Sequence, residues 1–132
     1  MTNEASMKVW KQQIFVDIDG TICSIKEDHN YLEAKPFPDR IKEINRLYDN
    51  GHIITYWTGR GGSTGFDWKN NTIMQLEDWG AKYHNLIVGD KPHFDLYICD
   101  KSVNSESYFN QQKFHITHTS FKEADEDFGF HL

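Results

Sequence analysis

Two aspartates separated by one residue follow an apolar run near the N-terminus, within Ile14–Thr21. The run predicts a buried strand. Because side chains alternate along a strand, Asp17 and Asp19 are expected to point the same way. Two like charges held that close are costly unless positive charge lies between them or one keeps its proton. A magnesium ion is the simplest remedy, since it is usually held by one or two carboxylates plus a substrate phosphate; a turn with two exposed aspartates is the plainer alternative.

Composition limits the classes of protein to which the chain can belong. Its 132 residues, 38% of them hydrophobic, favour a single domain over residues 1–132 with one core. A net charge of −6 disfavours nucleic acid as a partner. No apolar stretch approaches the roughly 20 residues that cross a bilayer, so we expect no membrane partner and a cytoplasmic protein. Cys23 and Cys99 are expected to be reduced and buried.

Strands alternate with helices along the chain. The expected elements after the first strand are a helix at 39–50, a strand at 52–57, a helix at 67–79, and strands at 85–88 and 96–99. This alternation predicts an α/β fold with a parallel sheet and right-handed crossovers. Ligands bind at the carboxyl ends of the strands in such sheets, and these ends carry four polar residues: Asp17, Asp19, Thr58 and Asp100. Residues 23–37 are expected to form a flap-like insertion, and residues 102–132 an extension that packs on the sheet or makes a subunit contact.

Four ordered motifs resemble those of the haloacid dehalogenase superfamily of aspartate-nucleophile phosphotransferases. They are Asp17–Thr21, Thr58 at a strand end, Lys91 before Pro92, and Asp100 after Leu96–Cys99. The closer resemblance is to small capless members of capsule and lipopolysaccharide biosynthesis, through Thr58–Gly61, Gly65–Trp68, Trp79–Gly80 and Tyr83–His84. The resemblance covers most of the chain between Ile14 and Ser102. It implies a Rossmann-like three-layer sandwich with a mostly parallel central sheet and no separate cap domain.

The resemblance also implies a role for each motif residue. Asp17 would be the nucleophile that forms an aspartyl-phosphate, and Asp19 would act as general acid and then general base. The phosphate would be bound by Thr58, Gly59, Arg60 and Lys91, although a solvent-facing Arg60 is an equal alternative. The cofactor Mg²⁺ would be held by Asp17, Asp100 and the backbone carbonyl of Asp19.

The sequence departs from the family pattern in two places. The capless relatives often end the fourth strand with two acids, whereas this chain has Cys99 before Asp100, so a second acid is missing or is supplied by Asp95. The relatives tend to have glycine before the lysine, whereas this chain has Asp90. These departures put the strength of metal binding and the position of Lys91 in question.

The expected function is a magnesium-dependent phosphatase that acts on a small phosphorylated metabolite, a sugar phosphate or related precursor of a surface polysaccharide. Because residues 23–37 are too few for a cap domain, the site is expected to be open or to be closed by a neighbouring subunit in a homo-oligomer. An open site would also admit a macromolecular phosphate such as a phosphoprotein. A non-catalytic binding module that retains the fold is an alternative from another class. A mutase is disfavoured, since it would need a cap to exclude water.

Overall fold

The computed structural model describes residues 11–25, 28 and 30–112. The chain divides into two compact units, Met1–His93 and Phe94–Leu132, and each is described here by itself. A single domain over residues 1–132, with residues 102–132 as an extension, stays a prediction. The aromatic residues from Phe114 onward lie outside the described residues.

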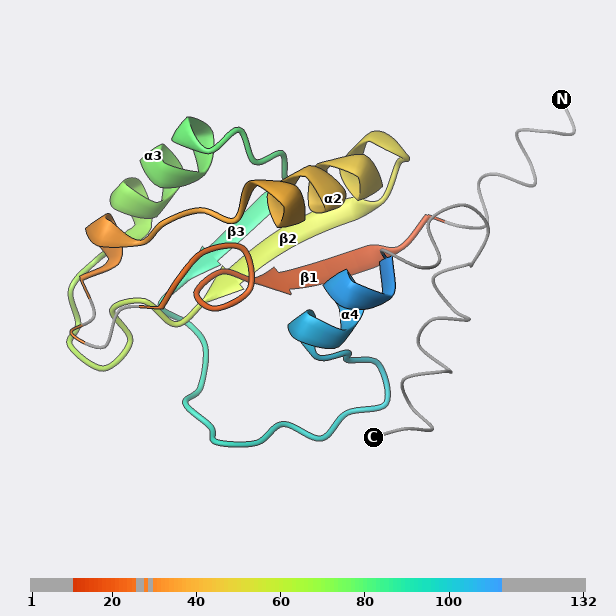
Figure 1. The fold of residues 1–132 in the computed structure, drawn as a ribbon. Helices are drawn as coiled ribbons and strands as arrows, with labels where there is room; N and C mark the ends of the chain where they lie inside the picture. Colours follow the sequence, from red (N-terminus) through yellow and green to blue (C-terminus); the bar gives the residue numbers. More distant parts are fainter. Residues whose placement is uncertain (1–10, 26–27, 29, 113–132) are drawn as a thin grey trace, which may run out of the picture. The chain divides into compact units, whose positions relative to one another are not determined.

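The first unit is built on a parallel sheet with strand order β1-β2-β3. Its strands are β1 (Gln13–Asp17), β2 (Ile53–Thr58) and β3 (Asn85–Val88). The register pairs Val16 with Tyr56 on the inner strand, and Trp57 with Ile87. Helices α2 (Pro38–Asp49) and α3 (Lys69–Asp78) form the two connections, and both lie over the same face of the sheet (Figure 1).

The covered face of the sheet carries the core of this unit. Val16, Ile54 and Tyr56 lie on that face, and each is at most 7% exposed. Helix α2 begins with Pro38 at its first turn, where a missing N–H costs nothing, and buries a stripe of Ile41, Ile44 and Leu47. Helix α3 contributes fewer buried residues, Thr72 and Leu76. The alternation of side chains leaves Phe15, on the other face of β1, 56% exposed.

The α/β, Rossmann-like fold class is confirmed, and the described residues contain no cap domain. Helices α2 and α3 and strands β2 and β3 each lie within two residues of their predicted bounds. Both helices of the first unit cover one face, so this unit supplies two layers of the expected sandwich. The segment 23–37 contains a short 3-10 helix, η1 (Tyr31–Glu33), and its ends are joined by hydrogen bonds from the Ser24 N–H to the Lys35 carbonyl and from the Phe37 N–H to the Ile22 carbonyl.

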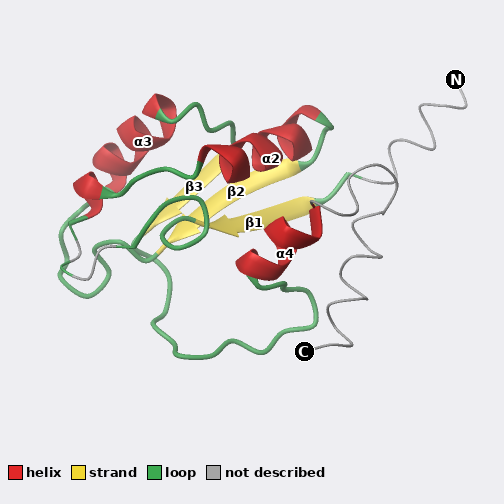
Figure 2. Cartoon of the chain, viewed as in Figure 1, coloured by secondary structure: helices red, strands yellow, loops and turns green. Residues whose placement is uncertain are grey.

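The predicted strand at 96–99 is wrong. Residues 94–104 of the second unit have no helix or strand and are drawn as a long loop in Figure 2. Leu96 and Ile98 are 74% and 86% exposed. A short apolar run becomes a strand only when a neighbouring strand pairs with it, because β-propensity chiefly measures the fit to that neighbour. Helix α4 (Ser105–Gln112) follows, and the Asn104 carboxamide oxygen accepts hydrogen bonds from the Glu106 and Ser107 N–H groups.

Both cysteines are free thiols, as predicted, but only one is buried. Cys23 is fully buried, whereas Cys99 is partly exposed in the loop before α4, so its predicted burial is wrong. Among the helices of the described residues, none is long and apolar enough to cross a bilayer.

The hydroxyl of Tyr56 gives a testable prediction about stability. This group is buried, and no described residue forms a hydrogen bond with it. Burying a polar group without a partner costs about 1–3 kcal/mol. We expect Tyr56→Phe to raise the free energy of unfolding by about 1 kcal/mol, measured by urea denaturation.

The ring of Tyr83 packs edge-on against Tyr56 and is half-buried, so Tyr83→Phe is a suitable control. That variant should change stability by less than about 0.5 kcal/mol. A Tyr56→Phe protein that is less stable than the wild type by 1 kcal/mol or more would mean that the hydroxyl has a partner.

Candidate active site

The ends of β1 and β3 place a carboxylate against an ammonium group. Asp17 is the last residue of β1, and its Oδ1 accepts a hydrogen bond from the Ile18 N–H at 2.8 Å and forms an ion pair with Lys91 Nζ at 3.0 Å. Lys91 follows the end of β3 by three residues. It lies near the end of β1 because parallel strands end at the same edge of the sheet. Among the described residues, only these two groups bind the Asp17 carboxylate, and both do so at Oδ1. The Asp17 side chain is 45% exposed, and no described residue binds its Oδ2.

Trp57 of β2 holds the segment that carries Lys91. Its indole N–H donates to the Asp90 carbonyl at 3.0 Å. Its ring faces the ammonium group, with Lys91 Nζ 5.2 Å from the ring centroid. A cation over an aromatic face is attracted by the ring quadrupole. The backbone of Asp90 is therefore held by Trp57, and Lys91 lies beside Asp17 although the Asp90 side chain is negatively charged.

Asp19 has a different cationic partner, Arg60. The carboxylate of Asp19 accepts two hydrogen bonds from the guanidinium, Nη2 to Oδ1 at 2.8 Å and Nε to Oδ2 at 3.0 Å. Such paired bonds fix the orientation of a carboxylate as well as its position. The Arg60 side chain is 1% exposed and that of Asp19 is 20% exposed. The solvent-facing alternative for Arg60 is therefore wrong.

The loop after β2 turns Arg60 inward. Gly61 has a φ of +82°, which favours glycine, and a Cβ there would collide with the carbonyl oxygen of Phe66. The hydroxyl of Thr58, at the end of β2, accepts a hydrogen bond from the Arg60 N–H at 3.3 Å and lies 3.4 Å from Asp19 Oδ2. Gly59 lies against Lys91, since a Cβ built on Gly59 would be 3.7 Å from Lys91 Cβ. The loop thus adjoins both ion pairs.

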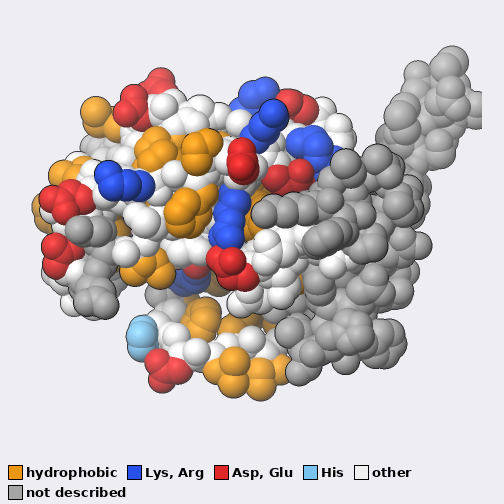
Figure 3. All heavy atoms as spheres, viewed as in Figure 1, with side chains coloured by type: hydrophobic (Ala, Val, Ile, Leu, Met, Phe, Trp, Pro, Cys, Tyr) orange, Lys and Arg blue, Asp and Glu red, His pale blue; other side chains and the backbone are white. Residues whose placement is uncertain are grey.

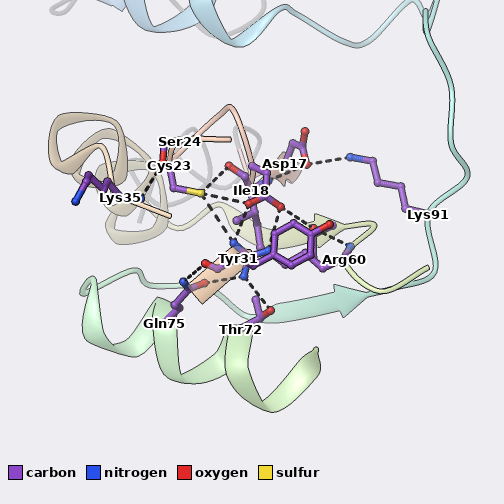
Figure 4. A network of polar contacts seen from close by, with 12 residues as sticks. Asp17, Ile18, Cys23, Ser24, Tyr31, Lys35, Arg60, Thr72, Gln75 and Lys91 are labelled. Carbon is purple, nitrogen blue, oxygen red and sulfur yellow. Dashed lines mark hydrogen bonds and ion pairs between the residues drawn. The ribbon is translucent and has the colours of Figure 1, made fainter. Parts of the chain in front are cut away.

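The two ion pairs offset the repulsion between two neighbouring carboxylates. Asp17 is compensated by Lys91 and Asp19 by Arg60, so the two negative charges face two positive ones. Figure 4 shows Lys91 reaching Asp17 from one side and Arg60 lying between the first-strand turn and α3. On the face drawn in Figure 3, basic and acidic side chains lie beside one another.

Burial and the charge of Asp19 also affect two neighbouring groups. Burial raises the pKa of the Cys23 thiol to about 12, and the negative charge of Asp19 adds to the shift. The same two causes raise the pKa of the Tyr31 hydroxyl. Both groups are therefore neutral near pH 7, and Cys23 is not a thiolate nucleophile.

The donor set at Asp17 suits a hard cation. A carboxylate that is half-exposed, with one oxygen unused by the protein, matches the preference of Mg²⁺ for oxygen ligands and for keeping several waters. No group of three or more acidic, histidine or cysteine side chains at metal-binding distance occurs within residues 11–25, 28 and 30–112. Asp100 belongs to the second unit, so its role beside Asp17 in binding one ion stays a prediction.

The structure thus joins most of the residues that the sequence singled out. Asp17 pairs with Lys91, and Asp19 with Arg60 and Thr58, in the first unit. Sequence reasoning missed the residues that support these pairs: Trp57, Tyr31, Thr72 and Gln75. Thr72 and Gln75 are three residues apart on one face of α3, and this polar pair beside the buried Leu76 is the signal that could have found them.

Comparison with known proteins found a structure with a similar fold. No protein-family model matches the sequence, and no curated protein matches it either. The structure is similar to the crystal structure of an MCSG target from Vibrio cholerae, with a TM-score of 0.64 and 22% sequence identity. The likeness covers 92% of this chain and 99% of that one. At this level of identity, it supports the α/β fold assigned above and no particular activity.

Proposed function

We propose that the protein is a magnesium-dependent phosphomonoester hydrolase that works through an aspartyl-phosphate on Asp17. The observation that carries this proposal is the Asp17–Lys91 pair, in which the ammonium binds one oxygen of a carboxylate that is 45% exposed and no described residue binds the other oxygen. A nucleophilic carboxylate needs both features, an open oxygen and a positive charge that offsets its repulsion from a phosphate dianion.

In the proposed first step, the open oxygen of Asp17 attacks the phosphorus atom and the bond to the leaving oxygen breaks. Lys91 is placed to offset charge on the phosphoryl oxygens, since it already lies 3.0 Å from Asp17 Oδ1. Asp19 would give a proton to the leaving oxygen. In the second step, water attacks the phosphorus atom, Asp19 takes its proton, and Asp17 is regenerated with inorganic phosphate. Mg²⁺, when bound by Asp17, the Asp19 carbonyl and Asp100, would supply further positive charge to the phosphoryl group.

The proposed substrate is a small phosphorylated metabolite, a sugar phosphate or related precursor of a surface polysaccharide. The resemblance to capless capsule and lipopolysaccharide phosphatases supports this class. The segment 23–37 is too short for a cap domain, and in this proposal a second subunit would enclose a small substrate. A macromolecular substrate such as a phosphoprotein would instead use the site uncovered.

Phosphate release from a panel of phosphorylated sugars, amino alcohols, nucleotides and phosphopeptides tests this proposal. We expect turnover with Mg²⁺ and a loss of at least about 100-fold in EDTA, because the ion offsets charge in the transition state. Added Mg²⁺ should restore the rate. Folded protein with no turnover on any compound would contradict the proposal and favour a non-catalytic binding module.

A further inference from the structure

Arg60 has every one of its donors directed at a group of the protein. Nε and Nη2 bind the two oxygens of Asp19, and Nη1 binds Thr72 Oγ1 at 3.2 Å and Gln75 Oε1 at 2.6 Å. The remaining Nη2 hydrogen has Cys23 Sγ at 4.0 Å. A guanidinium carries five N–H groups, so a substrate phosphate could bind Arg60 only by displacing one of these acceptors.

The guanidinium is itself held from two other elements. Helix α3 supplies Thr72 and Gln75, which bind the same nitrogen. The ring of Tyr31, in η1, lies over the guanidinium with its centroid 4.8 Å from the central carbon. Gln75 connects these elements, because its Nε2 donates to the Tyr31 carbonyl at 2.6 Å (Figure 4). Arg60 is therefore a fixed part of the structure before any substrate arrives.

We propose that Arg60 is a positioning residue that fixes the Asp19 carboxylate, in place of the phosphate-binding role expected from its sequence position. This inference rests on the proposed function, in which Asp19 transfers protons. A carboxylate held at both oxygens by a planar fork loses its rotational freedom. Proton transfer in a transition state requires such precision, since small misplacements of a catalytic group cost large factors in rate.

Loss of a positioning residue and loss of a phosphate ligand would affect two classes of substrate differently. Help from a general acid is needed most when the leaving oxygen is strongly basic, as in an alkyl phosphate, and least when it is a nitrophenolate. Loss of the positioning residue should therefore slow an alkyl phosphate selectively. Loss of a phosphate ligand would slow both substrates alike, because both present the same phosphoryl group.

The test compares kcat/KM for an alkyl phosphate and for 4-nitrophenyl phosphate, because kcat/KM reports the steps up to departure of the leaving group. Arg60→Lys keeps the charge but loses the fork. We expect it to lower kcat/KM about 100-fold for the alkyl phosphate and less than about threefold for the nitrophenyl ester. The inhibition constant of inorganic phosphate should stay within about twofold of the wild-type value, since the phosphate ligands are intact. Gln75→Met, which frees one side of the guanidinium, should change kcat/KM in the same direction by a smaller factor.

Arg46→Met is the matched control, because Arg46 makes a similar two-bond contact with Glu43 on α2, and the Arg46 side chain is 47% exposed. This variant should leave kcat/KM unchanged for both substrates. An equal fall for the two substrates, together with weaker inhibition by phosphate, would overturn the inference and make Arg60 a phosphate ligand. Unchanged kinetics in Arg60→Lys would overturn it as well.

A stability measurement separates this inference from the proposed function. If the wild type hydrolyses neither substrate, the proposed function fails, and the Arg60–Asp19 pair is then judged by thermal denaturation. The Tm shift caused by Asp19→Asn should be less than about half as large in an Arg60→Met background as in the wild type, because the two groups act as a unit. Additive shifts would overturn the inference.

Discussion

Asp17→Asn should abolish turnover, lowering kcat by at least about 10³-fold, because an amide cannot form the phosphoryl intermediate. The protein should remain folded. The Asn oxygen can still accept the hydrogen bond that Asp17 Oδ1 accepts from the Ile18 N–H. The lost ion pair with Lys91 is partly exposed, so its removal should cost about 1 kcal/mol or less. Phosphate release and a thermal melt on the same preparation give both quantities.

Asp78→Asn is the control for this change, because Asp78 is exposed at the end of α3 and away from the strand ends. It should retain wild-type kcat. An Asp17→Asn protein with more than about a tenth of wild-type activity would remove Asp17 from the nucleophilic role, since a nucleophile accounts for far more than tenfold.

Lys91→Met should lower kcat/KM by about 10²–10³-fold, because a positive charge would no longer stabilise the transferring phosphoryl group. The methionine keeps an apolar chain that can pack on Trp57, so the fold should be retained. The affinity for inorganic phosphate, measured by calorimetry in the presence of Mg²⁺, should fall together with kcat/KM.

Lys82→Met provides a matched comparison. Lys82 forms an ion pair with Asp49 at 2.9 Å, close in length to the pair of Lys91, but both of its groups are about half exposed. This variant should have wild-type kinetics and a Tm close to that of the wild type. Equal kinetics in Lys91→Met and Lys82→Met would exclude Lys91 from the phosphate site.

The parts of the fold that could be predicted are those in which local pattern and tertiary contacts agree. The apolar spacing of Ile41, Ile44 and Leu47 predicted α2, and these residues are buried against the sheet. The helix predicted at 67–79 begins at Lys69, whose N–H donates a hydrogen bond to the Asp67 carboxylate. The run at 96–99 failed because strand formation depends on a pairing partner, which composition does not reveal.

The candidate site likewise contains one contact that could be predicted from the sequence and one that could not. The order of the motifs predicted that Asp17 and Lys91 would meet, because the ends of parallel strands share one edge of the sheet. The inward direction of Arg60 could not be predicted, because a glycine-rich loop can place an arginine in solvent or in the interior. Its burial depends on acceptors from two separate segments: the turn after β1, which carries Asp19, and helix α3, which carries Thr72 and Gln75.

The central claim, a phosphoryl group carried by Asp17, can be tested by chemical trapping. The enzyme is mixed with Mg²⁺ and excess substrate, quenched in acid, and treated with sodium borohydride, which reduces an aspartyl-phosphate to homoserine. Peptide mass mapping should then find homoserine in place of Asp17 in the wild type, and unreduced aspartate at position 17 when substrate is omitted. Steady phosphate release with unmodified Asp17, or with homoserine in place of Asp19, would contradict the account.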